Sequence, residues 1–141
     1  MSTPWADRIA ISRVWVAGGA AFLLSLIANA LVRILVKAVF PISHLFVALQ
    51  EWQGIIFFTF IGVLGATVVF AVLARLTKHA IKVFRGLALI LLLLSFIPNI
   101  LMLTTNGPGA TAPAVASLMV MHVITAGITV WLLTTWPRVR M

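Results

Sequence analysis

Apolar residues fill four long runs of the chain, and short polar or basic segments separate them. A helix needs about 20 mostly apolar residues to cross about 30 Å of hydrocarbon. The pattern therefore predicts four membrane-spanning helices, at residues 14–39, 54–74, 86–103 and 114–136. Because the connections are short, consecutive helices are expected to be antiparallel neighbours. We predict an all-α fold, an integral membrane antiparallel four-helix bundle that forms one domain over residues 1–141.

The connection between the first two runs, "PISHLFVALQEWQ" at residues 41–53, has a pattern of its own. Pro41 ends the first helix, because proline breaks a helix interior. After it, apolar residues recur at helical spacing opposite polar ones. This pattern predicts a short amphipathic helix on the membrane interface, with Trp52 at the depth of the lipid headgroups.

Composition supports a membrane protein and argues against several other classes. The chain is 63% hydrophobic and 9% charged, whereas soluble domains are about 25% charged. Without cysteine it has no thiol nucleophile and no disulfide. It also has no HExxH pattern and no phosphate-binding glycine loop, and its two acidic residues, Asp7 and Glu51, lie outside the predicted spans. We therefore expect a protein that is not an enzyme and carries no cofactor.

Basic residues give the chain a formal net charge of +8 and predict its orientation. Most of them flank the same side of the predicted bundle: Arg8, Arg13, Arg75, Lys78, Lys82, Arg85, Arg138 and Arg140. The positive-inside rule places that side, with both termini, in the cytoplasm. These cations interrupt apolar runs, so we expect membrane lipids as partners and not nucleic acid. Within "RLTKHAIKVFR", the stripe of Arg75, Lys78, Lys82 and Arg85 is predicted to contact anionic lipid, with a specific phosphate ligand as the alternative.

Polar side chains inside the predicted spans lie at similar heights on three helices. Asn29 and Arg33 belong to the first, Asn99 to the third and His122 to the fourth. A cation within the hydrocarbon costs about 2.5–3.5 kcal/mol, which favours turning such groups inward. Together the four residues are a candidate ligand-binding pocket that opens outward and takes a small amphipathic or anionic lipid-like molecule.

Each pocket residue also has a structural interpretation. Arg33 can reach the outer headgroups or pair with Glu51, and Asn99 can join two helices by a hydrogen bond. His122 can be a packed histidine with a hydrogen-bond partner. No metal site is predicted, although His122 or His44 is a minor candidate for an axial ligand of a haem or chlorophyll-type pigment.

Not every polar residue of the first helix is expected to face the candidate pocket. Polar residues recur at four-residue spacing there, at Ser25, Asn29, Arg33 and Lys37. On a helix each such step rotates by about 40°, so the four positions sweep about 120° and are not expected to share one narrow face. We expect Ser25 and Asn29 inside the bundle and Lys37 at the outer headgroups. The direction of Arg33 separates a ligand pocket from a purely structural bundle.

Two segments, "LSFIPNI" at 94–100 and "LMVMHVITAG" at 118–127, together with Asn29, resemble a family of small bacterial four-helix membrane proteins of unknown function. The resemblance covers most of the chain. It implies a multi-pass protein of the bacterial inner membrane and brings no activity with it.

Three functions follow from these patterns as hypotheses. The first is a non-catalytic accessory or scaffold subunit that packs in a homo-oligomer or a larger membrane complex. The second is a binding or transport module that uses the outward-opening pocket. The third is the binding of a pigment through a histidine.

Overall fold

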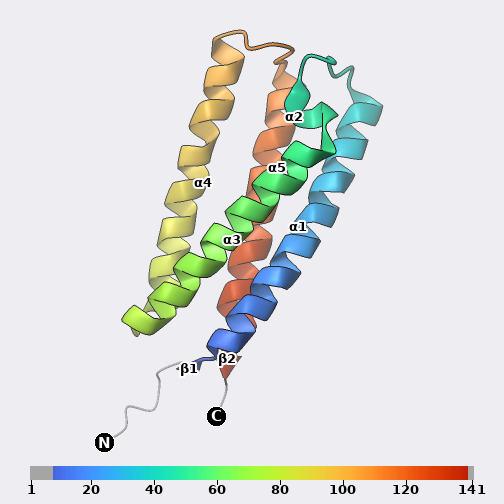
Figure 1. Ribbon diagram of the computed structural model, residues 1–141. Helices are drawn as coiled ribbons and strands as arrows, with labels where there is room; N and C mark the ends of the chain where they lie inside the picture. The colour runs from blue at the N-terminus through green and yellow to red at the C-terminus, as the bar shows by residue number, and fades with distance from the viewer. Residues whose placement is uncertain (1–7, 140–141) are drawn as a thin grey trace, which may run out of the picture.

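The computed structural model describes residues 8–139, and within them four long helices form a bundle (Figure 1). A two-residue strand precedes the bundle, another follows it, and one short helix lies between the first two long ones. The elements are β1 (Arg8–Ile9), α1 (Ile11–Val39), α2 (Val47–Gln50), α3 (Trp52–Leu76), α4 (Ala80–Thr104), α5 (Ala112–Thr135) and β2 (Arg138–Val139). The predicted all-α four-helix fold is confirmed.

The long helices run alternately up and down the bundle (Figure 1). α1 packs mainly on α5 and then on α3, while α4 packs on α5 and α3. Below the bundle, β1 and β2 pair antiparallel, with Arg8 opposite Val139 and Ile9 opposite Arg138. We call this end the ladder end, and the opposite end, which carries α2, the α2 end.

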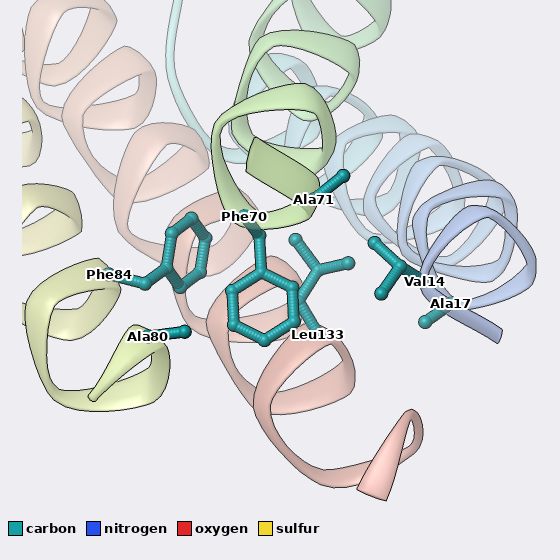
Figure 2. Close-up of a cluster of buried hydrophobic side chains, with 7 residues drawn as sticks. All are labelled: Val14, Ala17, Phe70, Ala71, Ala80, Phe84 and Leu133. Atoms are coloured by element: carbon teal, nitrogen blue, oxygen red, sulfur yellow. The ribbon is translucent and has the colours of Figure 1, made fainter. Parts of the chain in front are cut away.

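Buried apolar side chains form separate clusters at the two ends of the bundle. At the ladder end, Phe70 and Phe84 pack edge to face with ring centroids 5.0 Å apart. Figure 2 shows this cluster, which brings together side chains from all four long helices: Val14, Ala17, Phe70, Ala71, Ala80, Phe84 and Leu133. A second cluster at the α2 end holds Phe46, Leu49, Ile55, Ala114, Val115 and Met121.

The outer surface of the four long helices is apolar. Many of their large hydrophobic side chains are exposed, as lipid-facing residues would be. Each helix is long and apolar enough to cross a membrane, as in a multi-pass membrane protein. Exposed tryptophans lie toward both ends, Trp15 and Trp136 at the ladder end and Trp52 at the α2 end, where they can anchor in the headgroup layer.

Helix bounds differ from the predicted spans where polar residues are helical. α4 begins at Ala80, before the predicted span at 86. The span begins later because Lys82 and Arg85 make the first turns of the helix polar. Hydropathy marks the part of a helix that suits hydrocarbon and not the whole helix. Pro98 lies inside α4, which continues beyond it to Thr104. Within residues 41–53 the structure is helical over Val47–Gln50 and again from Trp52, where α3 begins.

Candidate functional site

Arg33 is buried at the α2 end, where it holds α2 against α1. Its Nε donates to the carbonyl oxygen of Leu49 (2.8 Å), and its Nη2 donates to that of Gln50 (2.7 Å). The guanidinium carbon lies 4.0 Å from the centroid of the Trp52 ring. The last carbonyls of a helix have no partner within the helix, so Arg33 caps the C-terminus of α2. It bonds to backbone carbonyls and not to Glu51.

A second basic residue on α1 strengthens this contact. Lys37 is exposed, and its Nζ donates to the side-chain oxygen of Gln50. The Gln50 amide donates in turn to the carbonyl oxygen of Ser43 (3.1 Å). Arg33 and Lys37 therefore both hold the connection between α1 and α3 against α1. This contact gives the two cations of an otherwise apolar helix a structural role.

The buried face of α1 includes Ser25, Asn29 and Arg33 together. Lys37 is exposed, so the series divides as expected, with Ser25 and Asn29 inside the bundle and Lys37 toward its α2 end. Arg33, whose direction the sequence left open, lies on the buried side, and the partner changes along the helix. Asn29 faces α3 and α5, whereas Arg33 faces the α2 segment.

Asn29 joins three helices in the interior of the bundle. Its Nδ2 donates to Thr59 Oγ1 on α3 and to Thr125 Oγ1 on α5, both at 3.1 Å. Sequence reasoning did not single out Thr59. Its position in the second span, at a height similar to that of Asn29, was the available signal.

The other two predicted pocket residues have different surroundings. Asn99 is buried, with 7% of its surface exposed, and its Nδ2 donates to the Ser95 carbonyl oxygen of its own helix (3.1 Å). His122 is exposed, and its Nδ1 lies 2.6 Å from the Leu118 carbonyl oxygen. No hydrogen bond in residues 8–139 links Asn29, Arg33, Asn99 and His122 to one another. The structure therefore does not assemble them into one polar group.

His44, the other candidate axial ligand, is exposed in the connection before α2. Among the described residues, no three His, Asp or Glu side chains come together in a group that could hold a metal ion.

Basic side chains converge at the ladder end in a groove of about 370 Å³. The start of α4 provides half of its lining residues, and the turn after α3 and the β1–β2 ladder provide the others. We call it the basic groove, and it is lined by Ile9, Lys78, His79, Ala80, Ile81, Lys82, Arg85 and Arg138. Lys78, Lys82 and Arg85 were predicted to act together, and the structure brings them into this one groove.

Two arginines of the basic groove converge on one threonine of α5. Arg85 Nη2 donates to Thr134 Oγ1 (3.2 Å), and Arg138 Nε donates to the Thr134 carbonyl oxygen (2.7 Å). Thr134 itself is fully buried, so it fixes both guanidinium groups at the wall of the groove. None of the lining residues is acidic. Glu51 lies at the α2 end, and Asp7 lies outside the described residues.

The four residues of the predicted stripe do not all line one groove, and a fifth cation joins three of them. Arg75 lies outside the basic groove and lines a smaller recess of about 130 Å³ with Ile11, Trp15, Val68, Ala71 and Val72. Arg138 joins the groove because the β1–β2 ladder ties the segment after α5 to the start of α1. The shared side of Arg138 and the 75–85 cations was visible in the sequence, but their contact depended on this unpredicted pairing.

Chemically, the basic groove suits a phosphate group. Arginine presents a planar fork of donors that binds phosphate oxygens in pairs, and lysine adds mobile positive charge. Four cations around a small volume repel one another, and a bound anion would relieve that repulsion.

A model of the family described as "Family of unknown function (DUF6069)" matches residues 8–138. The chain belongs to the DUF6069 family. This match confirms the predicted membership of a family without an established function, and it spans the bundle from β1 to Arg138. No curated protein and no solved structure matches the chain.

Proposed function

We propose that this member of the DUF6069 family is a non-catalytic accessory protein of the bacterial inner membrane that binds the phosphate of anionic phospholipids at its ladder end. The observation that carries the proposal is the basic groove, where Lys78, Lys82, Arg85 and Arg138 meet without an acidic lining residue. A groove at the end of apolar helices lies at headgroup depth when those helices span a membrane.

The energetic argument rests on charge near a membrane surface. Each Lys or Arg near an anionic leaflet contributes about 1 kcal/mol, and arginine adds paired hydrogen bonds to phosphate. The ladder end also carries Arg13 and Arg75 outside the groove. These two arginines therefore serve as a matched comparison for charge that is near the membrane but not in the groove.

Thermal unfolding of the purified protein in detergent tests the proposal. Added phosphatidylglycerol is expected to raise the melting temperature, whereas the zwitterionic phosphatidylcholine is not. The variant Lys78→Gln/Lys82→Gln should need about tenfold to thirtyfold more phosphatidylglycerol for the same rise, since it loses about 2 kcal/mol of attraction. Both lysines are exposed, so the fold should persist.

The control variant Arg13→Gln/Arg75→Gln removes the same charge from the same end, but neither arginine lines the groove, so it should need less additional phosphatidylglycerol than Lys78→Gln/Lys82→Gln. An equal loss in both variants would reject the groove as the site and assign the effect to general surface charge. An equal rise with inorganic phosphate alone would reject a lipid as the ligand.

The accessory role concerns α4, whose surface the bundle covers least. Among its described residues only Ala80, Phe84 and Asn99 are buried. Its remaining apolar surface is available to lipid or to another membrane helix, which supports packing in a homo-oligomer or a larger complex. We expect cross-linking in native membranes to join α4 to another chain. A protein that is monomeric in mild detergent, and that yields no cross-linked product in native membranes, would exclude this role.

A further inference from the structure

Three buried polar atoms inside the bundle have no hydrogen-bond partner in the structure: Ser25 Oγ, Asn29 Oδ1 and Thr129 Oγ1. The residues that carry them are 0%, 3% and 3% exposed. An unpartnered polar group in an apolar interior costs about 1–3 kcal/mol. Three such atoms on two adjoining helices therefore call for a partner.

The three atoms belong to one region of the α1–α5 interface. The bond from Asn29 to Thr125 sets the register of these antiparallel helices. Ser25 lies four residues before Asn29, and Thr129 lies four residues after Thr125. The two hydroxyl-bearing residues are thus at the same level, about 6 Å along the helix axes from the Asn29–Thr125 bond.

The hydroxyl groups of Ser25 and Thr129 differ from others in the bundle. Those of Thr67, Ser117 and Thr134 donate to carbonyl oxygens three or four residues earlier in their own helices. Such bonding satisfies a helical serine or threonine without any external partner. Ser25 and Thr129 make no such bond, so their hydroxyl groups remain available to a bound molecule.

We propose that an internal water molecule is bound between α1 and α5 by Ser25, Asn29 and Thr129. Buried waters typically make about three hydrogen bonds to otherwise unpartnered groups, which is the number of atoms present. A water can donate to Asn29 Oδ1 and exchange hydrogen bonds with both hydroxyl groups. Exchanging the oxygen and nitrogen of the Asn29 amide would still leave one amide atom unpartnered, and water can serve either of them.

A metal cation fits this site less well. The three oxygen atoms are uncharged, and an ion in the interior of the bundle would lose its hydration without a carboxylate to replace it. The water instead bridges the two most extensively packed helices close to the Asn29 network. This proposal is independent of lipid binding at the basic groove.

A double-mutant comparison tests whether the two hydroxyl groups share one partner. Ser25→Ala and Thr129→Val should each raise the unfolding equilibrium constant about threefold, the usual scale for a hydrogen bond within a membrane protein. The double variant should also show about threefold, because either change already removes the bridge. A ninefold change would overturn the proposal, since it would mean that the hydroxyl groups act independently.

Ser117→Ala is the matched control, because its hydroxyl group is buried and bonded within its own helix. Its effect should multiply with that of Ser25→Ala. If the alanine and valine variants do not fold, Thr129→Ser keeps the hydroxyl group, adds no atom to the buried interface and should fold.

A density map that resolves ordered waters provides the direct observation. A peak is expected between Ser25, Asn29 and Thr129 in the wild type and not in Ser25→Ala/Thr129→Val. Direct bonding of the two hydroxyl groups, with no density between them, would overturn the proposal. Stability should be the same in sodium chloride and choline chloride, and a rise specific to sodium would replace the water by a cation.

Discussion

Arg33→Met is expected to lower the free energy of unfolding by about 2–4 kcal/mol and to release the α2 segment from α1. The substitution leaves the carbonyl oxygens of Leu49 and Gln50 without their donor, and hydrogen bonds from a charged group contribute about 1.5–3 kcal/mol each. It also removes the cation from the face of the Trp52 ring, worth about 0.5–2 kcal/mol. Removing the charge from an apolar setting offsets part of this loss.

Hydrogen–deuterium exchange measures the local effect directly. Backbone amides of residues 42–51 should exchange faster in Arg33→Met, with little change in the middle of the long helices. Lys37→Met is the control, because Lys37 also bonds to Gln50 but is exposed, and exposed substitutions usually cost less than about 0.5 kcal/mol. Unchanged exchange at residues 42–51 in Arg33→Met would show that Arg33 does not hold α2.

Two adjacent glycines of α1 are expected to respond in opposite directions to alanine. A Cβ at Gly18 would lie 2.5 Å from Thr67 Oγ1 and 2.7 Å from Thr67 Cγ2, whereas a Cβ at Gly19 meets nothing within 4 Å. Gly18→Ala must therefore push α1 and α3 apart, and such overpacking costs about 1–3 kcal/mol. Gly19→Ala should raise stability by up to about 1 kcal/mol, because alanine favours the helix.

Equilibrium unfolding in mixed detergent compares the two variants. Thr67→Ala should partly restore stability to Gly18→Ala, since it removes the two nearest atoms of Thr67. Equal effects of the two glycine substitutions would contradict the close packing of α1 on α3 at this point.

The fold could be predicted from sequence because the hydrophobic pattern has the length that the bilayer demands. The bounds of individual helices were less accessible from the sequence. The helix α4 begins at Ala80, before the predicted span at 86, because Lys82 and Arg85 are polar residues in a helix that extends beyond its apolar run. Residues 41–53 have helical spacing, but the structure forms helix only at Val47–Gln50 and from Trp52, where α3 begins. Arg33 holds the end of α2, and the Gln50 amide holds the turn before it by donating to the Ser43 carbonyl oxygen.

The candidate site was also only partly predictable from the sequence. Lys82 and Arg85 could be grouped from spacing, because a three-residue step places them along one side of α4. Lys78 joins them from the turn that precedes this helix. Arg138 could not be grouped with them, because its place depends on a two-residue strand pairing. The direction of Arg33 was equally inaccessible, since helical geometry places a side chain around the axis but does not identify which neighbouring segment it meets.

Native mass spectrometry of the protein extracted from its own membrane tests the central claim, that the basic groove binds an anionic phospholipid. We predict one tightly bound anionic phospholipid per chain in the wild type and in Arg13→Gln/Arg75→Gln, and its loss in Lys78→Gln/Lys82→Gln. Equal lipid occupancy in all three proteins, or a bound lipid without an anionic headgroup, would contradict the claim.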